Sequence, residues 1–227
     1  MEGKKTGKGK YEDLLKGSIY NGDFSEDKKN GYGEEKYIDG SIYKGEYKNG
    51  LREGNGILIL KSKNKDYYIY KGEFKKGQIW GKGRLKWNNK KEYIGEWENS
   101  EISGYGFLLD GQVKHIGYFS HNMKEGFGAD FYEEQFYVLL GKWKEDLAEG
   151  PAIIFTLNKN SNNEINLERE TIVGMYKGEI INMKLKDEDI NTFKNSDDYQ
   201  EMIDLYKNKF LPDFLKNVNN NEENIDL

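Results

Sequence analysis

A short pattern of aromatic residues and glycines recurs along the chain at intervals of 22 to 27 residues. In its fullest form an aromatic residue, a glycine and a second aromatic residue occupy alternate positions, and a Gly-x-Gly pair follows. Copies begin at Tyr20, Tyr43, Tyr70, Tyr93, His115 and Leu139, and the last of these is worn, with Ala152 in place of its final glycine. A seventh copy begins at Ile172 and loses its second half, whereas Gly7-Lys8-Gly9 resembles a second half without a first. A period of this length favours an array of small stacked units over one globular core.

The spacing within each copy predicts a β-hairpin. Alternate residues of a strand face the same side, so the rings and glycines share one face. The Gly-x-Gly pair is predicted to start the return strand, with a neighbouring ring over the bare glycine backbone. Because a lone hairpin is marginal, the hairpins must stack into one antiparallel sheet. The residues expected to build it are Tyr20, Gly22, Phe24, Tyr43, Gly45, Tyr47, Tyr70, Gly72, Phe74, Tyr93, Gly95, Trp97, Gly117, Phe119, Gly141 and Trp143.

Turn signals mark the joints between copies. Asp39-Gly40, Asn88-Asn89 and Asp110-Gly111 are typical turn dipeptides. Two joints are longer: one extends over Lys61–Ile69, and Asn158–Glu170 is predicted to be a polar loop.

Composition agrees with this architecture. Aromatic residues make up 14 % of the 227 residues, and there are 27 glycines and only two prolines. The absence of cysteine excludes disulfides and thiolate chemistry. No secretory signal or stretch of about 18 apolar residues is present, so we expect a cytoplasmic protein. Residues 1–100 carry 22 Lys/Arg against 16 Asp/Glu, whereas the remainder carries 13 against 24.

These residues resemble the MORN (membrane occupation and recognition nexus) repeat over roughly residues 7–180. The copies beginning at Tyr43 and Tyr70 match the repeat at every position; His115, Leu139 and Ala152 depart from it. The resemblance implies an all-β fold: an elongated, single-layer, twisted antiparallel sheet of about six to seven hairpins. It also implies an interaction platform of the kind found in cytoskeletal, ciliary and membrane-junction assemblies.

The opposite face of the predicted sheet changes character along the chain. Early copies place polar residues there, and later copies place apolar ones. An apolar patch of this size is not normally left in water, so it is predicted to bind a partner or to be covered by a helix. The residues of this face are Ile94, Tyr105, Phe107, Leu109, Ile116, Tyr118, Phe127, Phe131, Leu140 and Phe155.

The segment after the repeats predicts an amphipathic helix. Ser196 is a good helix cap, and apolar residues follow at helical spacing. Its anchors are Tyr199, Ile203, Tyr206, Phe210 and, beyond a kink or restart at Pro212, Phe214. We expect this helix to pack on the apolar face; the alternative is that it projects to a partner or a second copy. The predicted organisation is 1–19 with a partial repeat, 20–185 as the array, 186–218 as the helical segment and 219–227 as a disordered tail.

Catalytic and metal-binding patterns do not emerge. His115 occupies a ring position and is interpreted as a packing substitute, and the Gly-x-Gly pairs lack the lysine and helix start of a phosphate loop. Asp187, Asp189 and Asn191 resemble a calcium loop but fit helix-start charge better, since Thr192 stands where glycine is required. We therefore expect no enzyme activity, cofactor, metal or nucleic-acid partner.

The sequence thus predicts a non-catalytic scaffold or adaptor that binds proteins, with an α-helical segment as one kind of partner and a homodimer left open. The alternative is a peripheral protein that binds anionic phospholipids through its basic N-terminal copies. The residues for that alternative are Lys44, Lys71, Lys82, Arg84 and Lys86.

Overall fold

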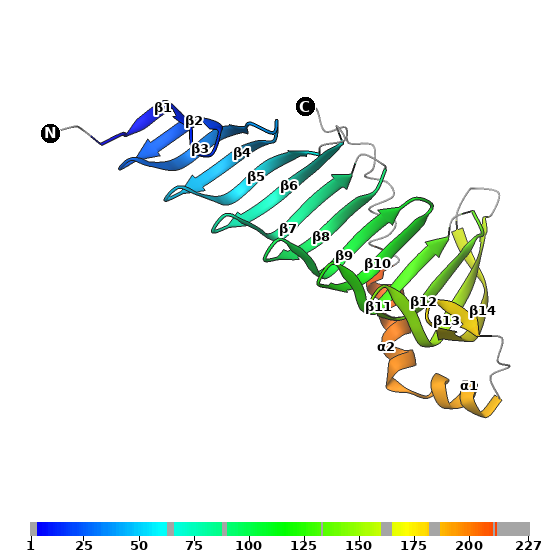
Figure 1. The fold of residues 1–227 in the computed structure, drawn as a ribbon. Helices are drawn as coiled ribbons and strands as arrows, with labels where there is room; N and C mark the ends of the chain where they lie inside the picture. The colour runs from blue at the N-terminus through cyan, green and yellow to red at the C-terminus, as the bar shows by residue number, and fades with distance from the viewer. Residues whose placement is uncertain are drawn as a thin grey trace. The chain divides into compact units, whose positions relative to one another are not determined.

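The computed structural model describes residues 4–62, 66–87, 90–132, 134–159, 165–181, 187–210 and 212. Fifteen strands follow one another in a sheet whose spatial order is the chain order. The chain divides into two compact units, Met1–Ile102 (unit 1) and Ser103–Leu227 (unit 2). The predicted all-β class and its succession of hairpins are confirmed, because β1 is followed by seven hairpins, β2–β3 to β14–β15. Figure 1 shows the strands in this order.

The strands correspond to the predicted half-copies. In unit 1 they are β1 (Gly7–Asp13), β2 (Ser18–Ser25), β3 (Lys28–Tyr37), β4 (Ile42–Lys48), β5 (Leu51–Lys61), β6 (Tyr67–Lys75), β7 (Gln78–Trp87) and β8 (Glu92–Glu98). Strand β9 (Glu101–Asp110) contains the boundary between the units. Unit 2 continues with β10 (Val113–Ser120), β11 (Met123–Tyr132), β12 (Tyr137–Lys144), β13 (Leu147–Lys159), β14 (Ile165–Tyr176) and β15 (Glu179–Ile181). Helices α1 (Asp187–Lys194) and α2 (Asp197–Leu205) and the π-helix η1 (Tyr206–Phe210) complete it.

Each hairpin closes through a two-residue turn with positive φ at both positions, as at Asn49 (51°) and Gly50 (86°). This is the conformation of a type I′ turn, whose twist matches that of the flanking strands. The return strand begins directly after the turn, for example at Leu51, three residues before Gly54. The prediction that the Gly-x-Gly pair starts the return strand is therefore wrong, because the pair lies inside the strand.

The first glycine of the pair instead lies in a β-bulge in hairpins β2–β3, β4–β5, β6–β7 and β10–β11. Gly54 has a φ of 66°, and the register shifts so that Glu46 alone lies opposite residues 53–55. The bulge frees the N–H of Asn55, which donates to Glu46 Oε1 at 2.9 Å. Asp23 and Glu73 accept the equivalent N–H groups of Tyr32 and Lys82 at 3.1 and 3.0 Å. The acidic residue after the first-strand glycine thus satisfies a backbone donor.

The lead tyrosine of each early hairpin lies on the bare backbone of two glycines. A β-carbon built on Gly56 would come within 2.6 Å of the Tyr43 ring, and the Tyr43 hydroxyl donates to the Glu46 carbonyl at 3.0 Å. Successive rings meet edge to face, with Tyr43 and Phe74 centroids 5.0 Å apart. The lead tyrosines are at most 1 % exposed: Tyr20, Tyr43, Tyr70 and Tyr93. These rings form the core of unit 1.

Unit 2 buries both faces of its sheet. One face carries Leu139, Trp143, Ala148, Ala152 and Met175. Residues of α1, α2 and η1 cover the other face. Figure 1 shows the helices beside the last hairpins. Such two-sided burial explains why apolar residues occupy both alternations of the later strands.

Strand pairing at the end of the array differs from the prediction. Asn158–Glu170 is not a polar loop: Thr156 pairs with Arg169 and Asn158 with Asn166, so β13 and β14 continue through most of it. The seventh copy keeps a three-residue second strand, β15. Helix α1 begins at Asp187, within the predicted helical segment 186–218, and the Ser196 cap is confirmed, since its side chain accepts from the Tyr199 N–H. The proposed continuation to Phe214 and the tail 219–227 lie outside the described residues.

Alanine substitutions at two glycines of hairpin β4–β5 distinguish the effect of the ring contact from the effect of backbone strain. Gly56→Ala should lower the free energy of unfolding of unit 1 by about 3 kcal/mol, because the Tyr43 ring must move. Gly50→Ala should cost about 1 kcal/mol, since its φ is 86° but no atom lies within 4 Å of the added carbon. Urea unfolding followed by tryptophan fluorescence measures both. Equal losses would show that the ring does not require a bare backbone.

Candidate interaction surfaces

Unit 1 carries an open groove of about 390 Å³ on its aromatic face. Its lining residues come from strands β5 to β8 and their turns, and they include one lead tyrosine, Tyr70. The described residues that line it are Arg52, Leu58, Leu60, Tyr68, Tyr70, Phe74, Gly77, Ile79, Leu85, Trp87, Trp97 and Ser100. This is the size and apolar character of a site for a few hydrophobic side chains.

Arg52 is the only charged residue among those described at the groove. Its guanidinium lies 4.8 Å from the centroid of the Tyr43 ring and donates to the Tyr37 hydroxyl at 2.8 Å. No ion pair joins it to a carboxylate in the part of the chain that the structure describes. The groove therefore combines apolar walls with a cation held by aromatic rings.

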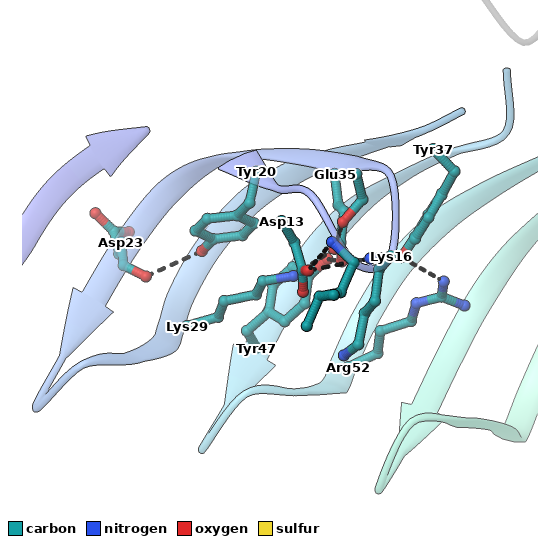
Figure 2. A network of polar contacts seen from close by, with 11 residues as sticks. Asp13, Lys16, Tyr20, Asp23, Lys29, Glu35, Tyr37, Tyr47 and Arg52 are labelled. Atoms are coloured by element: carbon teal, nitrogen blue, oxygen red, sulfur yellow. Dashed lines mark hydrogen bonds and ion pairs between the residues drawn. The ribbon is translucent and has the colours of Figure 1, made fainter. Parts of the chain in front are cut away.

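A buried carboxylate lies in the neighbouring hairpin of unit 1. Glu35 accepts hydrogen bonds from Ser18 Oγ at 2.8 Å and from the hydroxyls of Tyr37 and Tyr47 at 2.9 and 3.0 Å, and it pairs with Lys29. Figure 2 shows Lys29, Tyr37 and Tyr47 around Glu35, with Arg52 beyond Tyr37. Burial raises the pKa of Glu35, but the hydrogen bonds from Lys29, Ser18 and Tyr37 outweigh it and lower the pKa to about 2. Glu35 stays ionised at neutral pH.

A second buried carboxylate occurs in unit 2. Asp130 accepts from His115 Nδ1 at 2.6 Å and from Lys124 Nζ at 2.9 and 3.0 Å. Burial raises the pKa of Asp130, but His115 and Lys124 hold it below its usual value. Burial lowers the pKa of His115 against the opposing charges of Asp130 and Asp146. The imidazole is thus neutral and donates its Nδ1 proton to Asp130.

The two networks occupy the same positions in different copies. Counted from the lead residue, the cation is nine residues on and the carboxylate fifteen: Lys29 and Glu35, then Lys124 and Asp130. The copies led by Tyr70, Tyr93 and Leu139 place apolar residues at both positions: Ile79 and Leu85, Ile102 and Leu108, Ala148 and Ile154. In the copy led by Tyr43 the cation is Arg52 but the second position is Leu58. A cation at the first position is therefore accompanied by a carboxylate at the second in two copies. Arg52 is the exception, because Leu58 occupies the second position of its copy.

The His115–Asp130 pair resembles a general base with its orienting carboxylate, and an opening of about 270 Å³ lies beside it. However, Nε2, the atom that would take the proton, is buried. A β-carbon on Gly117 or Gly128 would lie within 2.9 Å of it, so Nε2 rests on the glycine backbone. The ring acts as the lead residue of its hairpin, packing edge to face on Phe119 and Trp143 at 5.2 and 5.1 Å.

The structure brings together most of the predicted partner-binding face in unit 2. Phe107, Ile116, Phe131, Leu140 and Phe155 are buried in one cluster, and Tyr105, Leu109 and Phe127 pack against it. The Tyr118 hydroxyl accepts from Lys209 Nζ at 3.0 Å. Ile94 is separate: it belongs to unit 1 and lies opposite Arg84.

The C-terminal helices supply the cover of that face. Of the predicted anchors, Tyr206 and Phe210 are fully buried, and Tyr199 and Ile203 are partly buried against the cluster. Phe193 of α1 and Met202 of α2 join them. Phe193 was missed in the sequence because α1 is a short helix, but its apolar side chain among polar neighbours was the available signal.

The cations proposed for lipid binding are partly neutralised. Lys44 pairs with Glu34 at 3.1 Å, and Arg84 pairs with Glu92. Lys71 lies in the same cross-strand row, between Ile57 and Arg84. Lys82 is exposed and its backbone N–H donates to Glu73, while Lys86 is half-buried opposite Glu92. The row is mixed in charge.

Comparison with protein families identifies the repeat. The MORN repeat model matches five stretches, residues 20–42, 43–65, 70–91, 93–111 and 115–128, which begin at the lead residues of the first five copies. The chain is a MORN repeat protein. The copies led by Leu139 and Ile172 lie beyond these matches, yet they form the hairpins β12–β13 and β14–β15 of this MORN array. No match was found among curated proteins.

Within the described segments, no helix has the length and apolar content needed to cross a bilayer. Across the same segments, no group of three or more His, Cys, Asp or Glu side chains is arranged to hold a metal ion.

Other copies of the repeat show which uncharged residues can replace His115, Lys124 and Asp130 in unit 2. Asp130→Leu alone should lower the free energy of unfolding by about 3 kcal/mol, because it leaves Lys124 and the His115 Nδ1 proton buried without a partner. The triple change His115→Tyr, Lys124→Ile and Asp130→Leu reproduces the Tyr93 copy. It should return stability to within about 1 kcal/mol of the parent or above it, as measured by urea unfolding. A triple variant weaker than the single one would contradict this account.

The neutral state of His115 predicts a pH dependence. Its pKa lies below the ordinary 6.5 in the folded chain, so the unfolded chain binds more protons as the pH falls through 6.5. The free energy of unfolding should therefore decrease between about pH 7 and 5. The contribution of Asp130, whose folded pKa is lowered from 3.8, is lost only at more acidic pH. Urea titrations at several pH values test this, and the triple variant, which lacks His115, should show a smaller decrease.

Proposed function

We propose that this MORN repeat protein is a non-catalytic scaffold that binds a partner protein in the groove of unit 1. The observation that carries the proposal is an open, mostly apolar groove on a face whose rings are otherwise buried. Leu60 is 43 % exposed within it, and Tyr68 of the adjoining strand is half-buried there. Large apolar side chains grouped in a concavity are typical of interaction sites.

The partner segment that fits is apolar with an acidic flank. Its hydrophobic side chains would occupy the groove between Leu58, Leu85 and Trp87, and a carboxylate would pair with Arg52. The excess of six positive charges in residues 1–100 (22 minus 16) would favour approach of an acidic segment. The interaction platforms of cytoskeletal, ciliary or membrane-junction assemblies, in a cytoplasmic setting, are the contexts in which we place this role.

Binding to anionic phospholipids through unit 1 is the second candidate, and it has less support. Its cations alternate with acidic residues, and Lys44 and Arg84 already have carboxylate partners. Binding to phospholipid headgroups would also give the apolar groove no role. Vesicles containing an anionic phospholipid therefore serve as one arm of the test.

Site-specific photocrosslinking can identify what enters the groove. A photoreactive amino acid at position 60 of the full chain should capture a partner segment with apolar residues and a nearby Asp or Glu. The same group at Leu15, which is fully exposed away from the groove, is the matched control. Leu60→Glu should reduce capture at least tenfold at position 68, which also lines the groove, and Arg52→Gln should weaken it and reduce its salt dependence.

Each outcome is decisive. Equal capture at positions 15 and 68, or capture unaffected by Leu60→Glu, would exclude the groove as the binding site. A cross-link to a second copy of the chain would replace the heterologous partner by a homodimer. Sedimentation with anionic but not neutral vesicles, lost on Lys71→Glu and retained with Leu60→Glu, would favour the lipid alternative and overturn the proposal.

A further inference from the structure

The apolar face of unit 2 is occupied by a helix from its own chain. Met202, Tyr206 and Phe210 lie four residues apart and are each at most 1 % exposed. They pack on sheet residues that include Phe131, Leu140 and Ile153. Beneath the helix, the sheet presents a continuous hydrophobic surface, so the face requires a cover in water.

The cover is imperfect at its centre. The Tyr206 ring stacks on Phe155 with centroids 4.9 Å apart, but its hydroxyl is buried and has no hydrogen-bond partner among the described residues. Burial raises the pKa of this hydroxyl to about 12. A buried polar group without a partner disfavours the packed state, whereas phenylalanine at this position would not.

The backbone of the cover is irregular at the same place. Helix α2 ends at Leu205 and continues as the π-helix η1 over Tyr206–Phe210. π-Helical turns are rare, and they are frequently found at functional sites. The polar contacts that hold the helix are peripheral, for example Lys142 with Asp198 at 2.7 Å, where both side chains are about half exposed. Exposed pairs of this kind contribute little to stability.

We propose that the apolar face of unit 2 is a helix-binding surface and that the C-terminal helix is its displaceable occupant. The partner is an amphipathic helix from another protein with three large apolar residues at positions i, i+4 and i+8. A residue without a hydroxyl, such as phenylalanine, takes the central position. A lysine at i+7 would repeat the contacts of Lys209, whose ammonium lies 3.8 Å from the Tyr105 centroid and donates to the Tyr118 hydroxyl.

The apolar i, i+4, i+8 pattern follows from the helix that the face already accepts. An incoming helix with this pattern can bury the same sheet residues and avoid the unpaired hydroxyl. It would release α2 and η1, so binding and exposure of the C-terminal segment are coupled. The surface lies within unit 2 and does not depend on the unit 1 groove.

A synthetic peptide with the sequence of residues 196–212 and the change Tyr206→Phe serves as the probe. Its binding to the full chain is measured by fluorescence anisotropy. The chain variant Tyr206→Phe should bind the probe about tenfold more weakly than the parent, because its own helix is better packed. The chain variant Phe210→Asp should bind at least tenfold more tightly, because its own helix is displaced. A peptide that also carries Phe210→Asp is the control and should not bind.

Hydrogen exchange provides an independent measurement on the same chains. Amides of α2 should exchange about tenfold more slowly in the Tyr206→Phe chain than in the parent. Unchanged exchange would show that the hydroxyl does not weaken the cover. Probe binding that is equal for all three chains, or absent from a Phe210→Asp chain that keeps its near-UV dichroism, would overturn the proposal. Exchange of helices between two copies, seen as a dimer by light scattering, would make the partner a second copy and overturn it too.

Discussion

The contact between a tyrosine ring and two bare glycines is the interaction on which the hairpins depend. The ring of Tyr43 occupies the space that β-carbons on Gly45 and Gly56 would need, so neither glycine can be exchanged without moving it. Its hydroxyl donates to the Glu46 carbonyl, and the Glu46 carboxylate accepts the N–H freed by the bulge. The tyrosine ring, the two glycines and the glutamate therefore form one structural unit, and its repetition builds the sheet.

This repeated structural unit explains why the fold could be predicted from the sequence. Alternation places ring and glycine on one face whatever the exact strand ends, so the lead residues and the hairpin order follow from spacing alone. The bulge could not be predicted in the same way. Gly54 is read as an ordinary strand glycine until its φ is known, and the role of Glu46 depends on a register shift that spacing does not reveal.

The candidate sites depend on packing that lies further from the repeat pattern. Alternation identified the apolar face of the later copies, but Ile94 belongs to the other unit and Phe193 comes from a helix too short for periodicity to indicate. The π-helix at Tyr206 has no sequence signature. The unit 1 groove was missed because its walls, Leu58 and Leu85, occupy positions where other copies place a buried carboxylate.

Some copies of the repeat place charged side chains nine and fifteen residues after the lead residue, and others place apolar ones. This difference determines where a partner can bind. Where Lys29 meets Glu35, the charges satisfy each other and their hydrogen-bond partners fill the space. Where Arg52 meets Leu58, the cation has no carboxylate in the described chain and the wall is apolar. A hairpin with only one member of the pair leaves both hydrophobic surface and unneutralised charge. The groove lies beside Arg52 and Leu58. A carboxylate from a partner would therefore supply the charge that this copy of the repeat lacks at the position of Leu58.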